Sequence, residues 1–186
     1  TYPQAIDVGN TTTYTVSNLN DGQTYYFAAT AYNRSGQQSV YSNEVSKVTP
    51  ISLPGGSLSD AIDVTGATIT TGGNANWVPQ TAIVYNGGDA TQSGAIGNSQ
   101  STWMQMTVTG PVTLSFYWKV SSEASYDYLR VYLDGVKQYE ISGEVNWQQK
   151  SINIPSGSHT VKWEYSKDGG VVRGSDKGWV DQVVLR

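Results

Sequence analysis

The middle of the chain contains a strictly alternating run of residues, and this run constrains the fold more than any other feature. Apolar side chains at Val112, Leu114, Phe116, Trp118 and Val120 alternate with Thr113, Ser115, Tyr117 and Lys119. A period of two places these sets on opposite faces of a β-strand and does not fit the helical period of about 3.6 residues. The chain also has 20 Val but only 7 Leu, which favours strands. We therefore predict an all-β protein.

Similar alternating runs recur through residues 57–186, and short turn sequences separate them. The other expected strands are 103–109, 128–133, 136–141, 147–154, 158–165 and 179–185, with weaker ones near 67–70 and 81–85. The expected tight turns are Gly110-Pro111, Asp134-Gly135 and Pro155–Gly157, and an Asp-Gly pair between alternating runs is typical of a β-hairpin. So many short antiparallel strands in one segment predict a β-sandwich of jelly-roll type.

The chain is expected to divide near residue 51. The sequence from Thr49 to Ser57 is rich in proline, glycine and small polar residues, which is typical of a linker. Tryptophan is absent from residues 1–50, whereas all six tryptophans follow residue 76. We therefore expect a first domain over residues 1–50, a linker over 51–56, and the jelly roll over 57–186.

The first segment has strand patterns of its own at residues 13–16, 24–32 and 42–48, with turn sequences at 20–22 and 33–36. Its motifs are Tyr14-x-Val16-x-x-Leu19, Gly22-x-x-Tyr25-x-Phe27-x-Ala29-x-Ala31-Tyr32-Asn33, Gly36, and Ser42-Asn43-Glu44-Val45. These motifs resemble the second half of a fibronectin type III domain. The resemblance implies that Tyr25 forms a tyrosine corner, with its hydroxyl bonded to the backbone near the preceding turn.

This resemblance covers only part of such a domain, because the first three strands are missing. Half a sandwich leaves an apolar face and a sheet edge without a partner. Two explanations stay open. The chain is a fragment of a longer multidomain protein, or another chain, including a second copy of this one, supplies the missing strands by edge addition. The fragment is the simpler explanation, since edge addition needs a dedicated partner.

The second segment carries a resemblance of its own. The residues that carry it are Leu114–Glu123, Asp127-x-Leu129-x-Val131-Tyr132-x-Asp134-Gly135, Ser142-Gly143-x-x-x-Trp147, Pro155–Asp168 and Gly178-Trp179-Val180-Asp181-x-Val183. They resemble the jelly-roll modules of bacterial surface and secreted proteins, related in pattern to cleaved-adhesin and MAM-type domains of the concanavalin-like class. The resemblance implies extracellular or cell-surface display, glycan or protein binding, and in many members a structural calcium ion.

Composition argues against several functions. The net charge of −4 gives no basic surface for nucleic acid. The chain has no cysteine and a single histidine, His159, which removes thiol chemistry and most histidine-based sites. No apolar run is long enough to span a membrane, and no clustered acidic motif of a glycosidase is present. We expect a protein that is not an enzyme and has no membrane span.

The longer connections of the jelly roll are expected to share one end of the sandwich, because antiparallel strands place every second connection at the same end. Function concentrates on such loops. Their acidic residues are Asp89, Glu123, Asp127, Glu144, Asp168 and Asp176. Calcium prefers carboxylate and carbonyl oxygens, so these residues are candidates for a structural calcium site. The alternative is ion pairing, for example of Glu123 or Asp127 with Arg173.

A second candidate calcium site combines residues of the first and last strands of the jelly roll. Asp60 or Asp63 lies on its expected first strand, and Asp181 lies on its last strand. The resemblance implies this site, because an aspartate on the final strand of related jelly rolls often contacts a structural calcium ion.

Exposed aromatic side chains are candidates for stacking on sugar rings. Alternation places Trp118 and Trp163 in the core. The candidates for a ligand site are Trp77, Tyr126, Trp147 and Trp179, with Arg173 as a basic neighbour. For each aromatic residue the alternative is burial in the core.

These observations predict a non-catalytic adhesion or binding module of a bacterial surface or secreted protein. It would bind a glycan or a surface protein at the end of the jelly roll that carries the long loops. Two alternatives remain: a structural or self-assembling subunit joined by strand addition to the incomplete first domain, and an accessory binding module of a secreted hydrolase.

Overall fold

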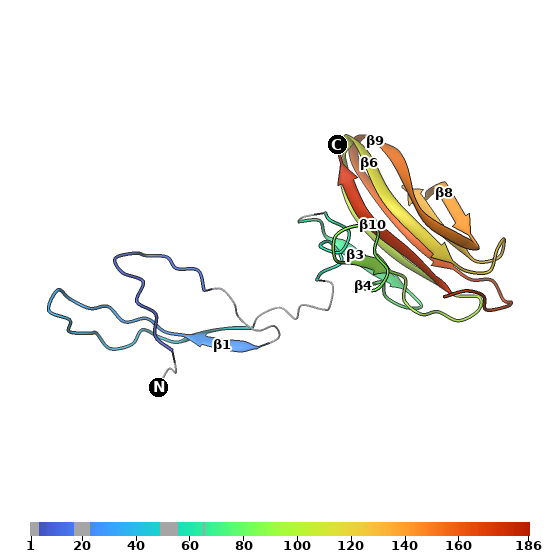
Figure 1. Cartoon of the computed structure of the whole chain (residues 1–186). Helices are drawn as coiled ribbons and strands as arrows, with labels where there is room; N and C mark the ends of the chain where they lie inside the picture. The colour runs from blue at the N-terminus through green and yellow to red at the C-terminus, as the bar shows by residue number, and fades with distance from the viewer. Residues whose placement is uncertain (1–3, 17–22, 49–55, 65) are drawn as a thin grey trace. The chain divides into compact units, whose positions relative to one another are not determined.

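The computed structural model describes residues 4–16, 23–48, 56–64 and 66–186. The chain forms two compact units, Thr1–Ser52 and Leu53–Arg186 (Figure 1). All regular structure in the described residues is β-strand, which confirms the predicted all-β class. The described part of the chain accordingly contains no helix that could cross a membrane. Most of the predicted linker, at residues 51–55, lies outside the described residues.

The first unit contains one antiparallel strand pair, β1 (Thr24–Phe27) and β2 (Val45–Val48). The predicted turn at residues 33–36 is present, since the Gly36 N–H donates to the Asn33 carbonyl at 2.9 Å. The predicted strand over 13–16 does not form, and the runs 24–32 and 42–48 form strands over only part of their length. A strand needs a neighbour for its backbone hydrogen bonds, and the described residues supply few.

The first unit exposes large apolar side chains. Val40 is 89% exposed, and Tyr14, Tyr26, Tyr32 and Val45 are each more than half exposed. Such a surface is what half a sandwich would present. The fibronectin type III resemblance is not confirmed, and Leu19 of the proposed tyrosine corner lies outside the described residues. Completion of this unit by an upstream segment or another chain stays a prediction.

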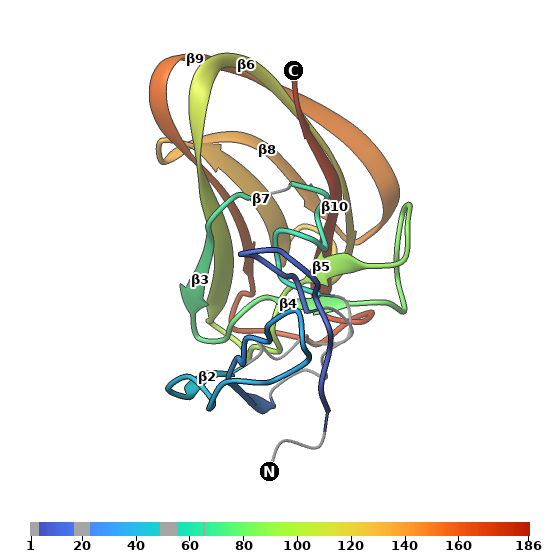
Figure 2. The ribbon, with the colours of Figure 1, turned by 90° about the vertical axis from the view of Figure 1, so that its left-hand side faces the viewer.

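The second unit is built around two long strands, β6 (Ser101–Ser121) and β9 (Glu144–Ser166). They pair antiparallel along almost their whole length and arch together over one end of the unit (Figure 2). The arch passes through Gly110 and Gly157, which lie directly opposite each other. Each long strand therefore belongs to two layers of the sandwich.

The shorter strands extend these two layers. Layer A holds the first half of β6, the second half of β9, β3 (Ile69–Gly73), β7 (Tyr128–Leu133) and β8 (Val136–Ser142). Layer B holds the other halves of β6 and β9, with β10 (Lys177–Leu185), β5 (Ala90–Gln92) and β4 (Val78–Gln80). The antiparallel sandwich predicted from the sequence is thus confirmed.

Two of the three predicted turns were wrong. Gly110-Pro111 and Pro155–Gly157 are bends inside β6 and β9, not connections between separate strands. Glycine, proline and a small polar residue give the same local pattern in a turn and in a sharp bend of a paired strand. The Asp134-Gly135 turn is confirmed, since it joins β7 and β8.

The core lies between the two layers. Leu114, Phe116 and Trp118 of the alternating run are fully buried, as predicted. Phe116 contacts Trp163 edge to face, with ring centroids 5.4 Å apart. Phe116 belongs to the layer B half of β6 and Trp163 to the layer A half of β9, so this contact joins the inner faces of the layers. Aromatic side chains of this size supply much of the stabilising burial in such a core.

His159 links the Asp134-Gly135 turn to the bend of β9. Its Nδ1 lies 2.6 Å from Asp134 Oδ2, and Asp134 Oδ1 accepts a hydrogen bond from the Thr160 N–H at 2.8 Å. The hydrogen bond to Asp134 raises the pKa of His159, with a smaller contribution from the Ser156 carbonyl, while burial lowers it. The same bond lowers the pKa of Asp134.

These shifts predict a pH-dependent contribution to stability. A raised histidine pKa stabilises the fold below the unfolded-state pKa, and this contribution disappears as the pH rises through the folded-state pKa. The lowered pKa of Asp134 has the opposite pH dependence. It stabilises the fold above the unfolded-state pKa of this carboxyl group, and this contribution disappears as the pH falls through the folded-state pKa. His159→Gln should therefore lower the urea midpoint most near pH 5 and much less near pH 9. A midpoint difference that does not change between these pH values would contradict the ion pair.

Candidate functional site

Four of the six tryptophans are buried, and their ring N–H groups have no hydrogen-bond partner among the described residues. They are Trp77, Trp118, Trp163 and Trp179. The prediction that Trp77 and Trp179 line a ligand site is therefore corrected, because they are only 2% and 1% exposed. Trp77 is held inward by its backbone N–H, which donates to Thr71 Oγ1 at 2.7 Å. Trp179 lies on β10, which has a strand on each side in layer B.

Trp147 is half-buried, and two tyrosines join it on the outer face of layer B. Tyr85, from the segment between β4 and β5, stacks on Tyr117 of β6 with ring centroids 3.6 Å apart and an interplanar angle of 13°. Trp147, near the start of β9, meets the Tyr85 ring at 6.1 Å in an edge contact. We call Tyr85, Tyr117 and Trp147 the aromatic cluster. Tyr85 is its most exposed member, at 41%.

Polar side chains from the same two strands flank the aromatic cluster. Gln149 lies directly opposite Tyr117, and Lys119 Nζ lies 3.4 Å from Asn146 Oδ1. The adjacent Tyr117 side chain, then burial and the nearby Asp181, raise the pKa of Tyr85. Its hydroxyl therefore stays protonated at neutral pH. The aromatic cluster and its neighbours combine partly exposed rings with amide, hydroxyl and ammonium groups.

This combination suits a ligand with one apolar face and many hydroxyl groups. A pyranose ring presents C–H groups on its face, which pack on an aromatic ring, and hydroxyl groups at its edge, which bond to amides. Binding sites in proteins commonly join aromatic side chains to a few placed polar groups in this way. The rings are also pre-ordered by one another, so binding would immobilise few free side chains.

The remaining predicted ligand residues lie outside this cluster. Tyr126 is 59% exposed and Arg173 is exposed, but neither makes a ring contact or an ion pair with the described residues. Two members of the cluster were missed. The alternating run did place Tyr117 on the outer face, so an outward tyrosine was visible in the sequence. No sequence pattern near Tyr85 predicted its place in the cluster, because its partners lie more than 30 positions away.

The long loops do meet at one end of the sandwich, through hydrogen bonds between their backbones and side chains. The Ser99 N–H donates to the Asp168 carbonyl at 2.6 Å, and the Asp168 N–H donates to Asp127 Oδ1 at 3.0 Å. The Ser175 N–H donates to Ser121 Oγ at 2.7 Å, and Ser121 Oγ donates to Glu144 at 2.7 Å.

A buried lysine occupies the centre of this end. Lys167 Nζ lies 3.6 Å from Asp127 Oδ2 and is also paired with Asp176. Asp176 accepts a hydrogen bond from the Tyr165 hydroxyl at 3.2 Å. Burial and the neighbouring carboxylates raise the pKa of Tyr165, which keeps this donor protonated. Asp127 and Asp176 therefore form ion pairs, which was the alternative to a calcium site. Their partner is Lys167 and not Arg173.

Several of the other predicted calcium ligands accept hydrogen bonds from neighbouring groups of the protein. Asp181 accepts backbone N–H groups from Tyr85 and Asn86 on Oδ2, and its own neighbour Gln182 on Oδ1. Asp60 accepts the N–H and hydroxyl of Ser57. Burial, with the charges of Asp63 and Asp60, raises the pKa of Asp89. Burial and Asp63 likewise raise the pKa of Asp181, so these carboxylates form an acidic neighbourhood.

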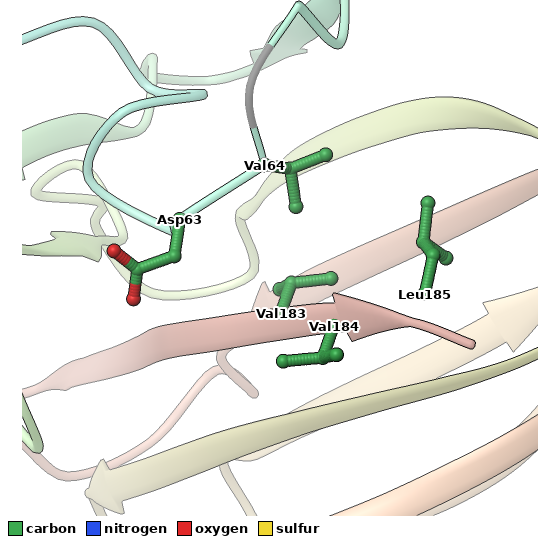
Figure 3. A pocket seen from close by; sticks show the side chains of 5 residues that line it. All are labelled: Asp63, Val64, Val183, Val184 and Leu185. Atoms are coloured by element: carbon green, nitrogen blue, oxygen red, sulfur yellow. The ribbon is translucent and has the colours of Figure 1, made fainter.

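Asp63 borders a hollow of about 280 Å³ whose other lining side chains are apolar: Val64, Val183, Val184 and Leu185 (Figure 3). This lining supplies no further oxygen side chain for a metal ion. Within the described ranges, no three histidine, cysteine, aspartate or glutamate side chains come together as a metal site. The side chains of Glu123 and Asp168 do not join such a group either. The calcium ion therefore stays a prediction.

The described residues show no catalytic group in the aromatic cluster. His159 is bonded to Asp134 and lies 3.4 Å from the Ser156 carbonyl, which accounts for both ring nitrogens. The Tyr85 ring stacks on Tyr117, and the pKa of Tyr85 is raised, so its hydroxyl is not activated as a base.

Comparisons with known proteins point to the fold. No protein-family model matches the chain. The Kelch domain-containing protein SSO1033 of Saccharolobus solfataricus is 37% identical over 87 residues, which cover 47% of this chain and 11% of that protein. The chain thus spans only a small part of that relative. The secreted serine protease VesC from Vibrio cholerae gives a TM-score of 0.51 at 13% identity, covering 91% of this chain and 35% of that one.

Two further solved structures are more distant. A carbohydrate-binding module of the β-sandwich superfamily gives a TM-score of 0.44 at 14% identity, covering 88% of this chain and 74% of that one. The K3 cleaved adhesin domain of Lys-gingipain from Porphyromonas gingivalis gives 0.40 at 13% identity, covering 54% and 75%. At 13% identity the likeness to the VesC structure bears on the fold alone.

Proposed function

We propose that the second unit is a non-catalytic carbohydrate-binding module and that the aromatic cluster is its binding site. The observation that carries this proposal is the gathering of Tyr85, Tyr117 and Trp147 on one outer face, beside Asn146 and Gln149. Three aromatic side chains on the outside of a sandwich do not serve the core. Their polar neighbours would bond to sugar hydroxyls while the rings pack on the sugar face. The module would act outside the cell, on a glycan of a surface or a secreted polymer.

The proposal predicts that truncating the cluster weakens sugar binding. Trp147→Ala and Tyr85→Ala should each lower the affinity for the best oligosaccharide about tenfold, because each removes a stacking surface worth ~1.4 kcal/mol. A glycan array with the full chain would find the oligosaccharide, and calorimetric titration would measure the affinity of each variant.

Tyr126→Ala is the matched control, since it removes an exposed tyrosine that touches no other ring among the residues that the structure describes. Its affinity should equal that of the wild type. If Tyr126→Ala loses binding while Trp147→Ala and Tyr85→Ala keep it, the ligand binds at the loops and not at the aromatic cluster. If no glycan on the array binds, the proposed function is wrong.

A further inference from the structure

Trp103 is the second of the two tryptophans that reach solvent, and it lies on the outer face of the opposite layer. Its neighbours in β6, Thr102 and Met104, are fully buried, so alternation turns Trp103 outward from layer A. Trp147 faces outward from layer B. The sandwich therefore presents one tryptophan on each outer face and buries the other four.

The fold makes room for the Trp103 ring. Gly72 of β3 lies directly opposite Trp103, and a Cβ at Gly72 would lie 2.5 Å from Trp103 Cζ2. The indole ring therefore covers the bare backbone of Gly72, which holds one of its faces against the sheet. A ring fixed in this way is a flat surface at the edge of layer A.

A hollow of about 380 Å³ lies further along β6 from Trp103. Gln105 is two residues beyond Trp103 on the same face of β6, and it lines the hollow together with Gly66, Ala67, Thr68, Thr70, Met106 and Thr107. Two positions along a strand correspond to about 7 Å. The lining offers three threonine hydroxyls and one amide and has no charged side chain. A volume of this size falls within the range of small-ligand sites.

The surface beyond Trp103 is polar but already paired. Glu164 lies opposite Trp103 and accepts hydrogen bonds from the Tyr132 hydroxyl at 3.3 Å and from Lys162 Nζ at 2.7 Å. Arg130 pairs with Glu140 at 3.1 Å and stacks on the Tyr128 ring at 4.3 Å. Charges of both signs thus balance one another, and this surface offers no excess charge to an ionic ligand.

From this we infer that layer A carries a second carbohydrate site, which takes a neutral pyranose unit in the hollow and stacks the adjoining unit on Trp103. The hydroxyl and amide lining matches sugar hydroxyls. Lys162 lies opposite Gln105 but is paired with Glu164, so the uncharged wall disfavours uronic acids, whose carboxylate would lose its hydration without a free cation. This inference rests on the proposed carbohydrate-binding function but uses a different surface. The module would then hold two glycan segments, one on each face.

The tryptophan ring N–H signals in a ¹H–¹⁵N spectrum of the full chain can test both sites at once. Trp103→Phe and Trp147→Phe identify the two signals, and the four buried tryptophans serve as internal references. Cellotriose, xylotriose and β-1,4-galactotriose are the neutral probes, and trigalacturonate is the acidic one. We expect at least one neutral probe to shift both the Trp103 and the Trp147 signals, each with its own dissociation constant.

The outcomes separate the inference from the proposed function. A shift of Trp147 alone overturns the second site and leaves the aromatic cluster standing. A shift of Trp103 alone supports the second site and overturns the aromatic cluster, and no shift overturns both. A Trp103 shift produced only by trigalacturonate overturns the neutral-sugar assignment.

A variant pair adds a test that does not depend on removing the tryptophan. Gln105→Ala should weaken binding at Trp103 by about threefold to tenfold, the loss of one hydrogen bond, and leave the Trp147 dissociation constant unchanged. Gln138→Ala is the control and should change neither value, since Gln138 is a half-buried residue of β8 that bonds only to the nearby Val136 carbonyl among the described residues. Equal values for Gln105→Ala and wild type would remove Gln105 from the site and overturn the placement of a sugar in the hollow.

Discussion

Lys167→Met is expected to lower the free energy of unfolding by about 3–5 kcal/mol, because it leaves a buried carboxylate without its counter-charge. The Lys167 and Asp127 side chains are 1% and 0% exposed, and Asp176 is 18% exposed. Methionine nearly preserves the shape of the lysine stem, so the loss would come from charge and not from a cavity. Lys167 was visible in the sequence as a basic residue of the long loops, but the acidic residues there were interpreted as metal ligands or as partners of Arg173.

Urea unfolding followed by tryptophan fluorescence measures this effect cleanly, because all six tryptophans lie in the second unit. The unfolding curve then reports the sandwich and not residues 1–52. Lys162→Met is the matched control. Its ion pair with Glu164 is partly exposed, at 29% and 19%, and such surface pairs contribute about 0–1 kcal/mol.

The comparison of Lys167→Met with Lys162→Met also bears on the predicted calcium site. A cation between Asp127 and Asp176 would have to displace Lys167, so a stabilising ion pair and a metal site cannot share these carboxylates. If Lys167→Met were as stable as Lys162→Met, the lysine would not be the required counter-charge. Asp127 would then need another partner, and the metal hypothesis at this end would regain support.

The sequence predicted those parts of the fold that depend on local periodicity. Alternation alone placed Leu114, Phe116 and Trp118 in the core and Tyr117 on the outer face, because the side-chain period of a strand is two wherever its partners lie. The Asp134-Gly135 hairpin followed from the turn chemistry of that pair.

The parts that failed depend on contacts between distant residues. Tyr85 stacks on Tyr117, which lies 32 positions away in the sequence, and no sequence pattern near either residue indicates this contact. Trp77 sits in a stretch rich in glycine and asparagine, which usually indicates an exposed loop, yet the bond from its N–H to Thr71 turns it into the core. Whether an aromatic residue serves a core or a ligand is decided by what covers it, and the covering segment is remote in sequence.

The bend of the long strands also depends on contacts between residues distant in sequence. It leads to the second prediction with a large expected effect on stability. Gly110-Pro111 and Pro155–Gly157 each look like a turn by themselves. They are bends because Gly110 and Gly157 face each other and let two paired strands curve together. A Cβ at Gly110 would lie 2.7 Å from the Ile154 carbonyl oxygen and closer still to that of Pro155. Backbone atoms of the partner strand, and not a flexible side chain, fill the space.

Gly110→Ala is therefore expected to lower the free energy of unfolding by about 3 kcal/mol or more, because the added methyl group must push the partner backbone away. Gly88→Ala is the control: a Cβ there meets nothing within 4 Å, so its effect should stay within about 0.5 kcal/mol. Both values come from the tryptophan-detected urea curves.

The outcome decides how the two layers are joined. A large loss at Gly110 means that β6 and β9 must cross the bend as a closely paired unit, and the two outer faces are then fixed relative to each other through these strands. Wild-type stability of Gly110→Ala would mean that the strands separate at the bend at little cost. The layers would then be linked mainly by core contacts such as Phe116 with Trp163, and the spacing between the two proposed sugar sites would not be set by the backbone.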